Sequence, residues 1–441
     1  MDLPRAKPRL GHRALRVPVT VPAARRSLGT RDVRHLVDEQ CFPPCSSGRV
    51  GVEIEWLAVC LADPTEPVRP EVVGEAGAEL PAGSRLTFEP GGQVELSSPP
   101  LRGIGPACAS IAADAAALTT ALADHGVGLI GLGLDPGPAR PRCVDSPRYE
   151  AMEAYFDAQG VSASAAGRTM MRSTAALQVN VDLGPTAADA ARRWHRAHDV
   201  GPLLAAAFAN SPLSGGAPSG WRSRRLAVWT DVDECRTAAA DGNGEPDPVR
   251  QWTDYALAAR VMFIRRDESR FVPILEPLTL GDWIANGHEL GFPTLDDVSY
   301  HFTTLFPPVR PRGWLEMRMI DSLPDPWWRA AVAVSTTLVC DDTAADAAAD
   351  AIAPTRERWL DAARHGLGHP DLAGAARDAF DVALQAMVRL GTDATTVLAV
   401  EAFVDRYVAR GRCPADDRLD AWQDDGTLIP APDQFAAATW A

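Results

Sequence analysis

The chain has 441 residues, 46% hydrophobic and 23% charged, which allows a sizeable core in one large domain or in two to three ordinary ones. The formal net charge of −15 argues against a nucleic-acid binder, which needs a basic surface, although a local arginine cluster can still hold a nucleotide. Because Lys7 is the only lysine, a Gly-x-x-x-x-Gly-Lys-Ser/Thr phosphate loop is excluded, and phosphate chemistry must rest on arginine and metal.

Residues 1–48 are rich in arginine and proline and show weak periodicity, which predicts a basic N-terminal extension that is partly disordered. A short amphipathic helix fits residues 31–40. The N-terminus lacks the apolar core of a secretory signal, and no apolar run reaches the roughly 20 residues that a membrane span needs. The eight cysteines are scattered, and no second pair completes a zinc site with Cys41 and Cys45. Free thiols in a reducing cytoplasm, without a membrane partner, are therefore expected.

Two acidic segments stand out next. Residues 50–61 and 85–97 both predict strands, and side chains two apart on a strand share a face, so Glu53 and Glu55 project together. Glu89 and Glu95 repeat this arrangement if no bulge intervenes at Gly91. Adjacent carboxylates repel, and a hard cation such as Mg²⁺ compensates that repulsion. The solvated face of an edge strand is the alternative, and it is the commoner outcome for a single Glu-x-Glu pair.

The remaining chain alternates helices with strands. Helices are predicted at residues 107–125, 147–156, 186–210 and 295–304, a helix running into a strand at 251–266, strands at 127–134, 172–183 and 313–321, and a mostly helical part from 326 onward. This order predicts an α+β fold, an antiparallel sheet covered on one side by helices, in a single domain over residues 49–441. The polar faces of its strands would form one wall, with Gln178, Asn180, Glu316 and Arg318 beside the four glutamates of the acidic segments.

Five glutamates on one wall require cations, because an unpaired buried charge is costly. With about two or three Mg²⁺ ions and a bound triphosphate, the wall becomes a phosphoryl-transfer site. Arg318 would then reach the transferred phosphate bidentately; alternatively, it only pairs with Glu316 across the strand.

A second cluster combines arginines with two tryptophans: Arg168, Arg172, Arg222, Arg224, Arg225, Arg236, Trp221 and Trp229. Guanidinium groups match carboxylates, so this cluster predicts a carboxylate-binding pocket, although some members could be solvated or paired with nearby acids. Met170 and Met171 would line an apolar part of that pocket or fill the core.

Several strings resemble one known family: GVEIEW, FEPGGQVELS, RTMMRSTAALQVNVD, FANSP, SRRLAVWTDVDECRT, DYAL and WLEMRMIDSLP. They are similar to glutamate–cysteine ligases of the plant-like class, and most similar to the actinobacterial branch that acts in ergothioneine biosynthesis. The resemblance runs from about residue 50 to residue 342. It implies a glutamine-synthetase-like catalytic fold, whose curved, mostly antiparallel sheet forms a funnel over metal and nucleotide.

The resemblance also implies a reaction and roles. ATP would phosphorylate the γ-carboxylate of L-glutamate, and the amine of L-cysteine would attack the acyl phosphate to give γ-glutamylcysteine, ADP and phosphate. The implied metal ligands are Glu53, Glu55, Glu95 and Glu316, with Glu89 a weaker candidate. The implied catalytic pair is Arg318 with Glu316, and the implied substrate and nucleotide contacts are Arg172, Arg225, Trp229, Arg236, Gln178, Asn180 and Met170. Gln178 departs from the pattern, because related ligases often carry a histidine at this position.

Two alternatives stay open. Another carboxylate–amine ligase or a guanidino kinase of the same fold would show the same wall, and a non-catalytic regulator that binds nucleotide or amino acid could keep the fold. The sequence does not set the oligomeric state, and a monomer is compatible with it.

Overall fold

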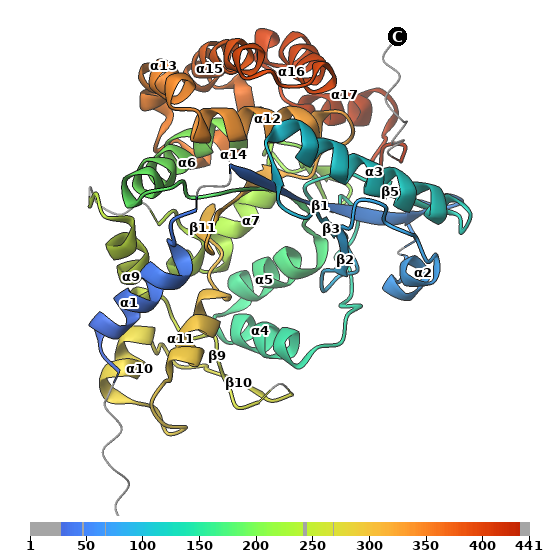
Figure 1. Cartoon of the computed structure of the whole chain (residues 1–441). Coiled ribbons are helices and arrows are strands. Elements are labelled where there is room, and N and C mark those ends of the chain that lie inside the picture. Colours follow the sequence, from blue (N-terminus) through green and yellow to red (C-terminus); the bar gives the residue numbers. More distant parts are fainter. Residues whose placement is uncertain (1–27, 46–47, 67, 241–244, 268, 433–441) are drawn as a thin grey trace, which may run out of the picture.

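A twisted antiparallel sheet lies at the centre of the protein (Figure 1). The structure is a computed structural model that describes residues 28–45, 48–66, 68–240, 245–267 and 269–432. Within these residues the sheet has eight strands in the order β11-β12-β6-β1-β3-β2, and β4 and β5 both pair with β1. The strands are β1 (Arg49–Cys60), β2 (Arg85–Phe88), β3 (Val94–Ser97), β4 (Leu101–Arg102), β5 (Val127–Ile130), β6 (Ala176–Val181), β11 (Val309–Pro311) and β12 (Leu315–Asp321).

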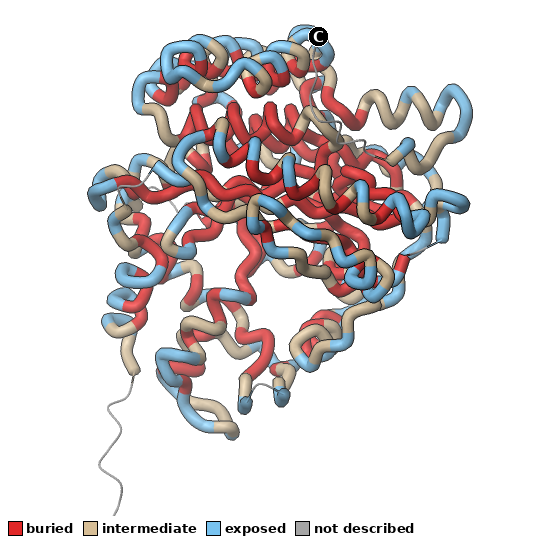
Figure 2. Tube along the Cα trace, turned by 45° about the vertical axis from the view of Figure 1, so that its right-hand side comes forward, coloured by how far each residue is buried: buried red, intermediate tan, exposed pale blue. Residues whose placement is uncertain are grey.

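One face of this sheet is packed against helices. The face carries alternate residues of β1, and Val52, Ile54 and Trp56 are fully buried there. The helices on it are α3 (Ile104–Ala123), α6 (Ala187–Ala207) and α12 (Trp327–Cys340). A second layer of helices, coloured orange to red in Figure 1, lies over α12. It consists of α13 (Asp342–Ile352), α15 (Pro370–Leu390), α16 (Ala394–Arg406) and α17 (Pro414–Asp425). Most residues of the sheet and of α12 are buried. Buried residues, in red, gather at the centre of the molecule (Figure 2).

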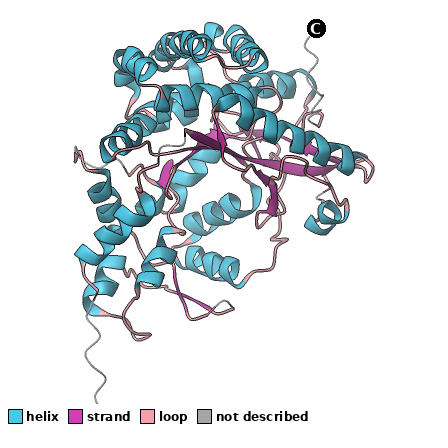
Figure 3. Ribbon diagram, viewed as in Figure 1, coloured by secondary structure: helices cyan, strands magenta, loops and turns pink. Residues whose placement is uncertain are grey.

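The opposite face of the sheet is turned toward α4 (Pro147–Ala158), α5 (Val161–Ser173) and α7 (Arg224–Val232) (Figure 3). Residues of the sheet and of these helices line a common cavity. The other elements are α1 (Thr30–Cys41), α2 (Pro70–Glu75), α8 (Glu234–Thr237), α9 (Pro248–Ala258), α10 (Leu280–Asn286), α11 (Leu295–Phe302), α14 (Trp359–His365), the two-stranded sheets β7 (Leu213–Ser214) with β8 (Ala217–Pro218) and β9 (Phe263–Arg265) with β10 (Phe271–Pro273), and short 3₁₀ turns at Ala353–Thr355, Gly366–Gly368 and Val408–Arg410.

The α+β prediction is confirmed, and most predicted elements appear near their expected bounds. Three details differ. Residues 85–97 are a hairpin, because they turn back at Gly91 and Gly92 rather than continuing as one strand. The strand expected at 172–183 is shorter, since Arg172 belongs to the unpredicted helix α5. The strand expected at 127–134 ends at Ile130.

The N-terminal prediction concerns residues that the structure describes only in part. Residues 1–27 lie outside the described residues. The helix expected at 31–40 is confirmed as α1, which packs against α9 and α11 through the buried residues Val33 and Val37. The boundary between an extension and a catalytic domain at residues 48 and 49 stays a prediction.

Helix α3 corrects one statement about the sequence. With 20 residues and an apolar composition, it is long enough to cross a membrane, the one such helix among the described residues. In the fold, α3 packs on β1 and β5 through Ile111, Ala115 and Leu118, all fully buried. The buried Asp114 on α3 accepts hydrogen bonds from the backbone N–H groups of Ala82 and Ser84 at 2.7 and 2.8 Å. A sheet-covering core helix explains its apolar composition.

Candidate active site

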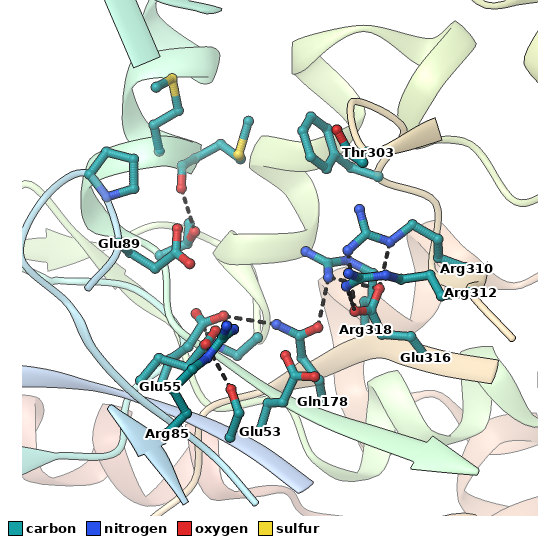
Figure 4. Close-up of a pocket in the computed structure, with 18 of the residues that line it drawn as sticks. Glu53, Glu55, Arg85, Glu89, Gln178, Thr303, Arg310, Arg312, Glu316 and Arg318 are labelled. Carbon is teal, nitrogen blue, oxygen red and sulfur yellow. Dashed lines mark hydrogen bonds and ion pairs between the residues drawn. The ribbon is translucent and has the colours of Figure 1, made fainter. Parts of the chain in front are cut away.

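A cavity of about 670 Å³ opens between the sheet and helices α4, α5 and α7. This volume lies within the range of small-molecule sites. Glu53, Glu55 and Glu89 lie at one side of the cavity and Arg310, Arg312 and Arg318 at the other, with Gln178 between the two groups (Figure 4). The cavity therefore has an acidic end and a basic end.

The acidic end is built by neighbouring strands. Glu55 on β1 stands directly opposite Glu95 on β3, and carboxylate oxygens of Glu55, Glu89 and Glu95 all lie within 4.8 Å of one another. Hydrogen bonds fix two of these groups: the backbone N–H of Ala176 donates to Glu55 Oε2 at 2.7 Å, and Thr87 Oγ1 donates to Glu95 Oε1 at 2.7 Å. The expectation that Glu53 and Glu55 face one cavity together is confirmed.

Glu89 reaches this cluster by a different route from the predicted one. It lies in the turn between β2 and β3, where the N–H of Glu89 donates to the carbonyl of Gln93 at 2.9 Å. Gln93 Nε2 donates to the carbonyl of Thr174 at 2.8 Å, and a Cβ added to Gly91 would lie 1.9 Å from the carbonyl oxygen of Arg172. The turn is therefore pressed against the end of α5, and Gly91 is required there because no side chain fits.

The electrostatics of the acidic end call for a cation. Burial, with repulsion from Glu316 and Glu95, raises the pKa of Glu53 to about 7. Burial, with repulsion from Glu95, raises the pKa of Glu55 to about 7, and burial with repulsion from Glu55 and Glu95 raises the pKa of Glu89 to about 8. Carboxylate oxygens gathered in this way are the ligands that Mg²⁺ prefers, so the residues present fit the metal.

The basic end is organised around Glu316. This carboxylate is fully buried and accepts hydrogen bonds from Arg310 Nε at 2.6 Å, Arg312 Nη1 at 3.1 Å and Arg318 Nη1 at 3.1 Å. Although burial alone would raise it, the three guanidinium groups hold the pKa of Glu316 well below its usual range. Glu316 thus balances arginines here, whereas the predicted metal-ligand role requires it to leave at least part of that pairing.

Arg310 and Arg312 are site residues that were not predicted from the sequence. Both line the cavity, and Arg310 also donates to the carbonyl of Leu305 at 3.1 Å. Arg310 lies on β11 directly opposite Glu316 of β12, and Arg312 follows the end of β11. The spacing Arg-Pro-Arg was the available signal, but proline and a three-residue strand obscured it.

Four of the predicted binding residues line the cavity: Arg225, Trp229, Met170 and Gln178, whose contacts are given below. Arg225 Nη2 donates to the carbonyl of Arg318 at 2.7 Å, and the guanidinium carbons of Arg225 and Arg318 each lie 5.6 Å from the centre of the Trp229 ring. Arg225 and Trp229 therefore contact Arg318 and help to hold it in place.

Three other predicted residues do not line it. Arg172 donates to Glu153 Oε1 from Nε and Nη2 at 2.9 and 2.7 Å. Asn180 donates to Glu53 Oε1 at 2.9 Å and accepts from Trp314 Nε1.

Arg236, the third of these residues, is fully buried in a network of its own. It donates to Asp233 Oδ2 at 3.0 Å, to the Tyr155 hydroxyl at 3.0 Å and to the carbonyls of Thr304 and Arg260 at 2.9 and 2.8 Å. These bonds hold α4, α8 and the chain before β9 together, and none of the bonded partners lines the cavity.

Glutamine Gln178 lies on β6 between the two ends. Its Nε2 donates to Glu55 Oε1 at 3.0 Å, and its Oε1 accepts from Arg318 Nη1 at 2.7 Å (Figure 4). The residue Gln178 is 3% exposed.

An antiparallel sheet with carboxylates and arginines on its open face agrees with the fold that the resemblance to the carboxylate–amine ligases implies. The solved glutamate–cysteine ligase of Francisella tularensis, in complex with AMP, has a similar fold, with a TM-score of 0.51 and 13% identity over 87% of this chain and 86% of that chain. Residues 49–433 match the family model described as glutamate–cysteine ligase family 2, so the chain belongs to this enzyme family.

Individual relatives agree with the family. The glutamate–cysteine ligase EgtA of Mycolicibacterium smegmatis is 41% identical over 378 residues, covering 85% of this chain and 87% of the relative. EgtA of Mycobacterium tuberculosis is 42% identical over 397 residues, 87% and 88% of the two chains. The chloroplastic glutamate–cysteine ligase of Arabidopsis thaliana is 30% identical over 76% of this chain and 66% of the relative.

Proposed function

We propose that the protein joins the γ-carboxylate of L-glutamate to the amine of L-cysteine at the expense of ATP, through a γ-glutamyl phosphate. The products are γ-glutamylcysteine, ADP and phosphate. One observation carries the proposal: a single cavity combines three carboxylates within 4.8 Å of one another with an arginine end, and Gln178 joins the two. The names of the relatives, glutamate–cysteine ligases, support the choice of substrates.

The two ends divide the work of the first step. Glu53, Glu55, Glu89 and Glu95 would hold about two or three Mg²⁺ ions, which supply charge compensation for the phosphates of ATP. Arg318 offers its guanidinium to the transferred phosphoryl group, whose charge spreads over oxygens that a planar fork can bind. Arg310 and Arg312 keep Glu316 ionised and add positive charge for a substrate carboxylate.

The second step needs positioning more than a protein nucleophile. Phosphorylation supplies the leaving group that a free carboxylate lacks, and the amine then attacks the acyl carbon. Apolar side chains at the opposite side of the cavity, among them Met152, Met170 and Phe306, exclude water that would hydrolyse the acyl phosphate. The cysteine ammonium loses one proton to become the attacking amine and a second as the amide forms, and a carboxylate of the wall or the phosphate itself accepts them.

The test is ATP turnover with Mg²⁺ and L-glutamate while the amine acceptor is varied. We expect ADP and γ-glutamylcysteine to form with L-cysteine in preference to L-serine, L-alanine and L-2-aminobutyrate. Equal turnover with other amines would favour another ligase of the same fold, and turnover with a guanidino acceptor without glutamate would favour a kinase. A complete lack of turnover would favour a regulator.

We also propose that the product feeds ergothioneine biosynthesis in the cytoplasm. The similarity to the two EgtA enzymes supports the pathway, and no disulfide joins any two cysteines among the described residues, which is compatible with a reducing compartment. Deleting the gene from its host should deplete ergothioneine, and restoring it should restore the compound. Unchanged ergothioneine after deletion would contradict this placement.

A further inference from the structure

Gln178 makes two side-chain hydrogen bonds, and they point in opposite directions along the wall. One joins it to a carboxylate of the acidic end and the other to a guanidinium of the basic end. Only nitrogen can donate to Glu55 and only oxygen can accept from Arg318, so a single orientation of the amide satisfies both partners. With Gln178 3% exposed, water has little room to replace either bond.

The backbone of β12 is adapted to this contact. Met317 pairs with Val179 and Ile320 with Leu177, so the register shifts and two residues, Arg318 and Met319, stand opposite Gln178. Such a bulge re-aims a side chain. It brings Arg318 Nη1 to 2.7 Å from Gln178 Oε1 and 3.1 Å from Glu316 Oε2.

The two bonds of Nη1 set the plane of the guanidinium. Among the described residues, Nη2 of Arg318 makes no hydrogen bond, and Arg318 lines the cavity. Without the amide, Arg318 and Glu55 would be opposite charges on either side of β6, free to pair directly. Direct pairing would take Arg318 from the phosphate and Glu55 from the metal.

We propose that Gln178 is a positioning residue that separates Arg318 from Glu55 and fixes the guanidinium for the phosphoryl group, and that it is not a metal ligand. An amide ligates a metal through its oxygen, and here Oε1 is held by Arg318. The inference rests on the proposed function for the identity of the reaction that Arg318 serves.

The experiment compares Gln178→Leu with a matched control, Gln251→Leu. Gln251 is also a buried glutamine whose amide is hydrogen-bonded at both ends: its Oε1 accepts from Trp194 Nε1 at 2.5 Å and its Nε2 donates to the carbonyl of Glu245 at 2.6 Å. It does not line the cavity. Both variants are assayed for kcat and KM with all substrates. Mn²⁺ binding is followed separately by electron paramagnetic resonance of the free ion, without turnover.

For Gln178→Leu we expect kcat to fall at least about 100-fold, with the Mn²⁺ dissociation constant within about threefold of wild type. For Gln251→Leu we expect kcat within about threefold of wild type. The inference is overturned if Gln178→Leu keeps kcat within about threefold, or if it loses Mn²⁺ affinity about tenfold or more and regains kcat at saturating Mn²⁺. If the wild type makes no γ-glutamylcysteine, the proposed function fails, while Mn²⁺ binding still tests the metal-ligand clause.

Gln178→Glu keeps the test decisive if the leucine variant does not fold. An ionised glutamate pairs with Arg318 as an ion and cannot donate to Glu55, which it repels, so it draws the guanidinium away from the phosphoryl group. The positioning role predicts a kcat at least about 100-fold lower for this variant. Tighter Mn²⁺ binding with kcat retained would show a metal ligand instead.

Discussion

Replacing Arg318 by alanine should separate catalysis from folding. Arg318 donates to Gln178 at 2.7 Å and to Glu316 at 3.1 Å. After its removal Glu316 keeps Arg310, at 2.6 and 3.2 Å, and Arg312, at 3.1 Å. The carboxylate therefore stays ionised and paired, and we expect the free energy of unfolding to fall by only about 1–3 kcal/mol.

The catalytic loss should be much larger. A preorganised donor to a developing oxyanion contributes about 10²–10³ to kcat, and Arg318 adds a full positive charge to its donors. We expect ADP release to fall at least about 10³-fold at saturating substrates, and Arg318→Lys to recover only part of it, because an ammonium does not match the guanidinium fork. Turnover above about a tenth of wild type in Arg318→Ala would refute the assignment of Arg318.

Arg236→Ala is the matched contrast. Its guanidinium is buried with partners on Asp233, Tyr155, Thr304 and Arg260, none of which lines the cavity. Removing it leaves buried polar groups unpaired, so we expect a loss of about 3–5 kcal/mol in the free energy of unfolding and an unchanged KM for glutamate. A raised KM with unchanged stability would instead support the glutamate-pocket role that the family resemblance implied.

Three further predictions concern the acidic end. Gly91→Ala should lower kcat at least about tenfold, because the added Cβ would lie 1.9 Å from a backbone oxygen and must displace the turn that carries Glu89. Gly74→Ala is the control, because a Cβ there would have no atom within 4 Å. Equal activity of the two variants would contradict the packing of the turn against α5. Glu55→Gln should abolish turnover and weaken Mn²⁺ binding, measured by electron paramagnetic resonance, while circular dichroism stays unchanged; normal turnover would refute the metal-holding wall. In metal-free protein the folded pKa values of Glu53, Glu55 and Glu89, about 7, 7 and 8, exceed the ordinary value of 4.5. The folded state therefore binds more protons than the unfolded state, and the free energy of unfolding should fall as pH rises from about 4.5 to 8. Thermal melts in chelator should show this fall, and the variant with all three glutamates replaced by glutamine should not show it.

Alternation along single strands made part of the site predictable. Glu53 and Glu55 on β1, and Glu316 and Arg318 on β12, could be placed on one face because the period of a strand is two. Glu89 was placed correctly for a wrong reason: the strand was expected to run on, yet the hairpin turn and its contact with α5 bring the carboxylate back to Glu95.

Other features depend on contacts between distant segments. Helix α5 escaped prediction because its glycine, serines and alanines give little apolar periodicity, and it is defined by packing on α4 and α7. Arg236 was assigned to the pocket by its sequence neighbourhood, but its partners Tyr155 and Thr304 lie 81 and 68 residues away. A local pattern cannot show which of several arginines such distant groups will capture.

The central claim, activation of the glutamate γ-carboxylate as an acyl phosphate, is tested most directly by oxygen transfer. Glutamate labelled with ¹⁸O in the γ-carboxylate is turned over with ATP, Mg²⁺ and L-cysteine, and the phosphate is analysed by mass spectrometry. We expect one ¹⁸O atom in the inorganic phosphate for each γ-glutamylcysteine formed, and none in ADP. Phosphate without label, at a measured turnover to γ-glutamylcysteine, would contradict it.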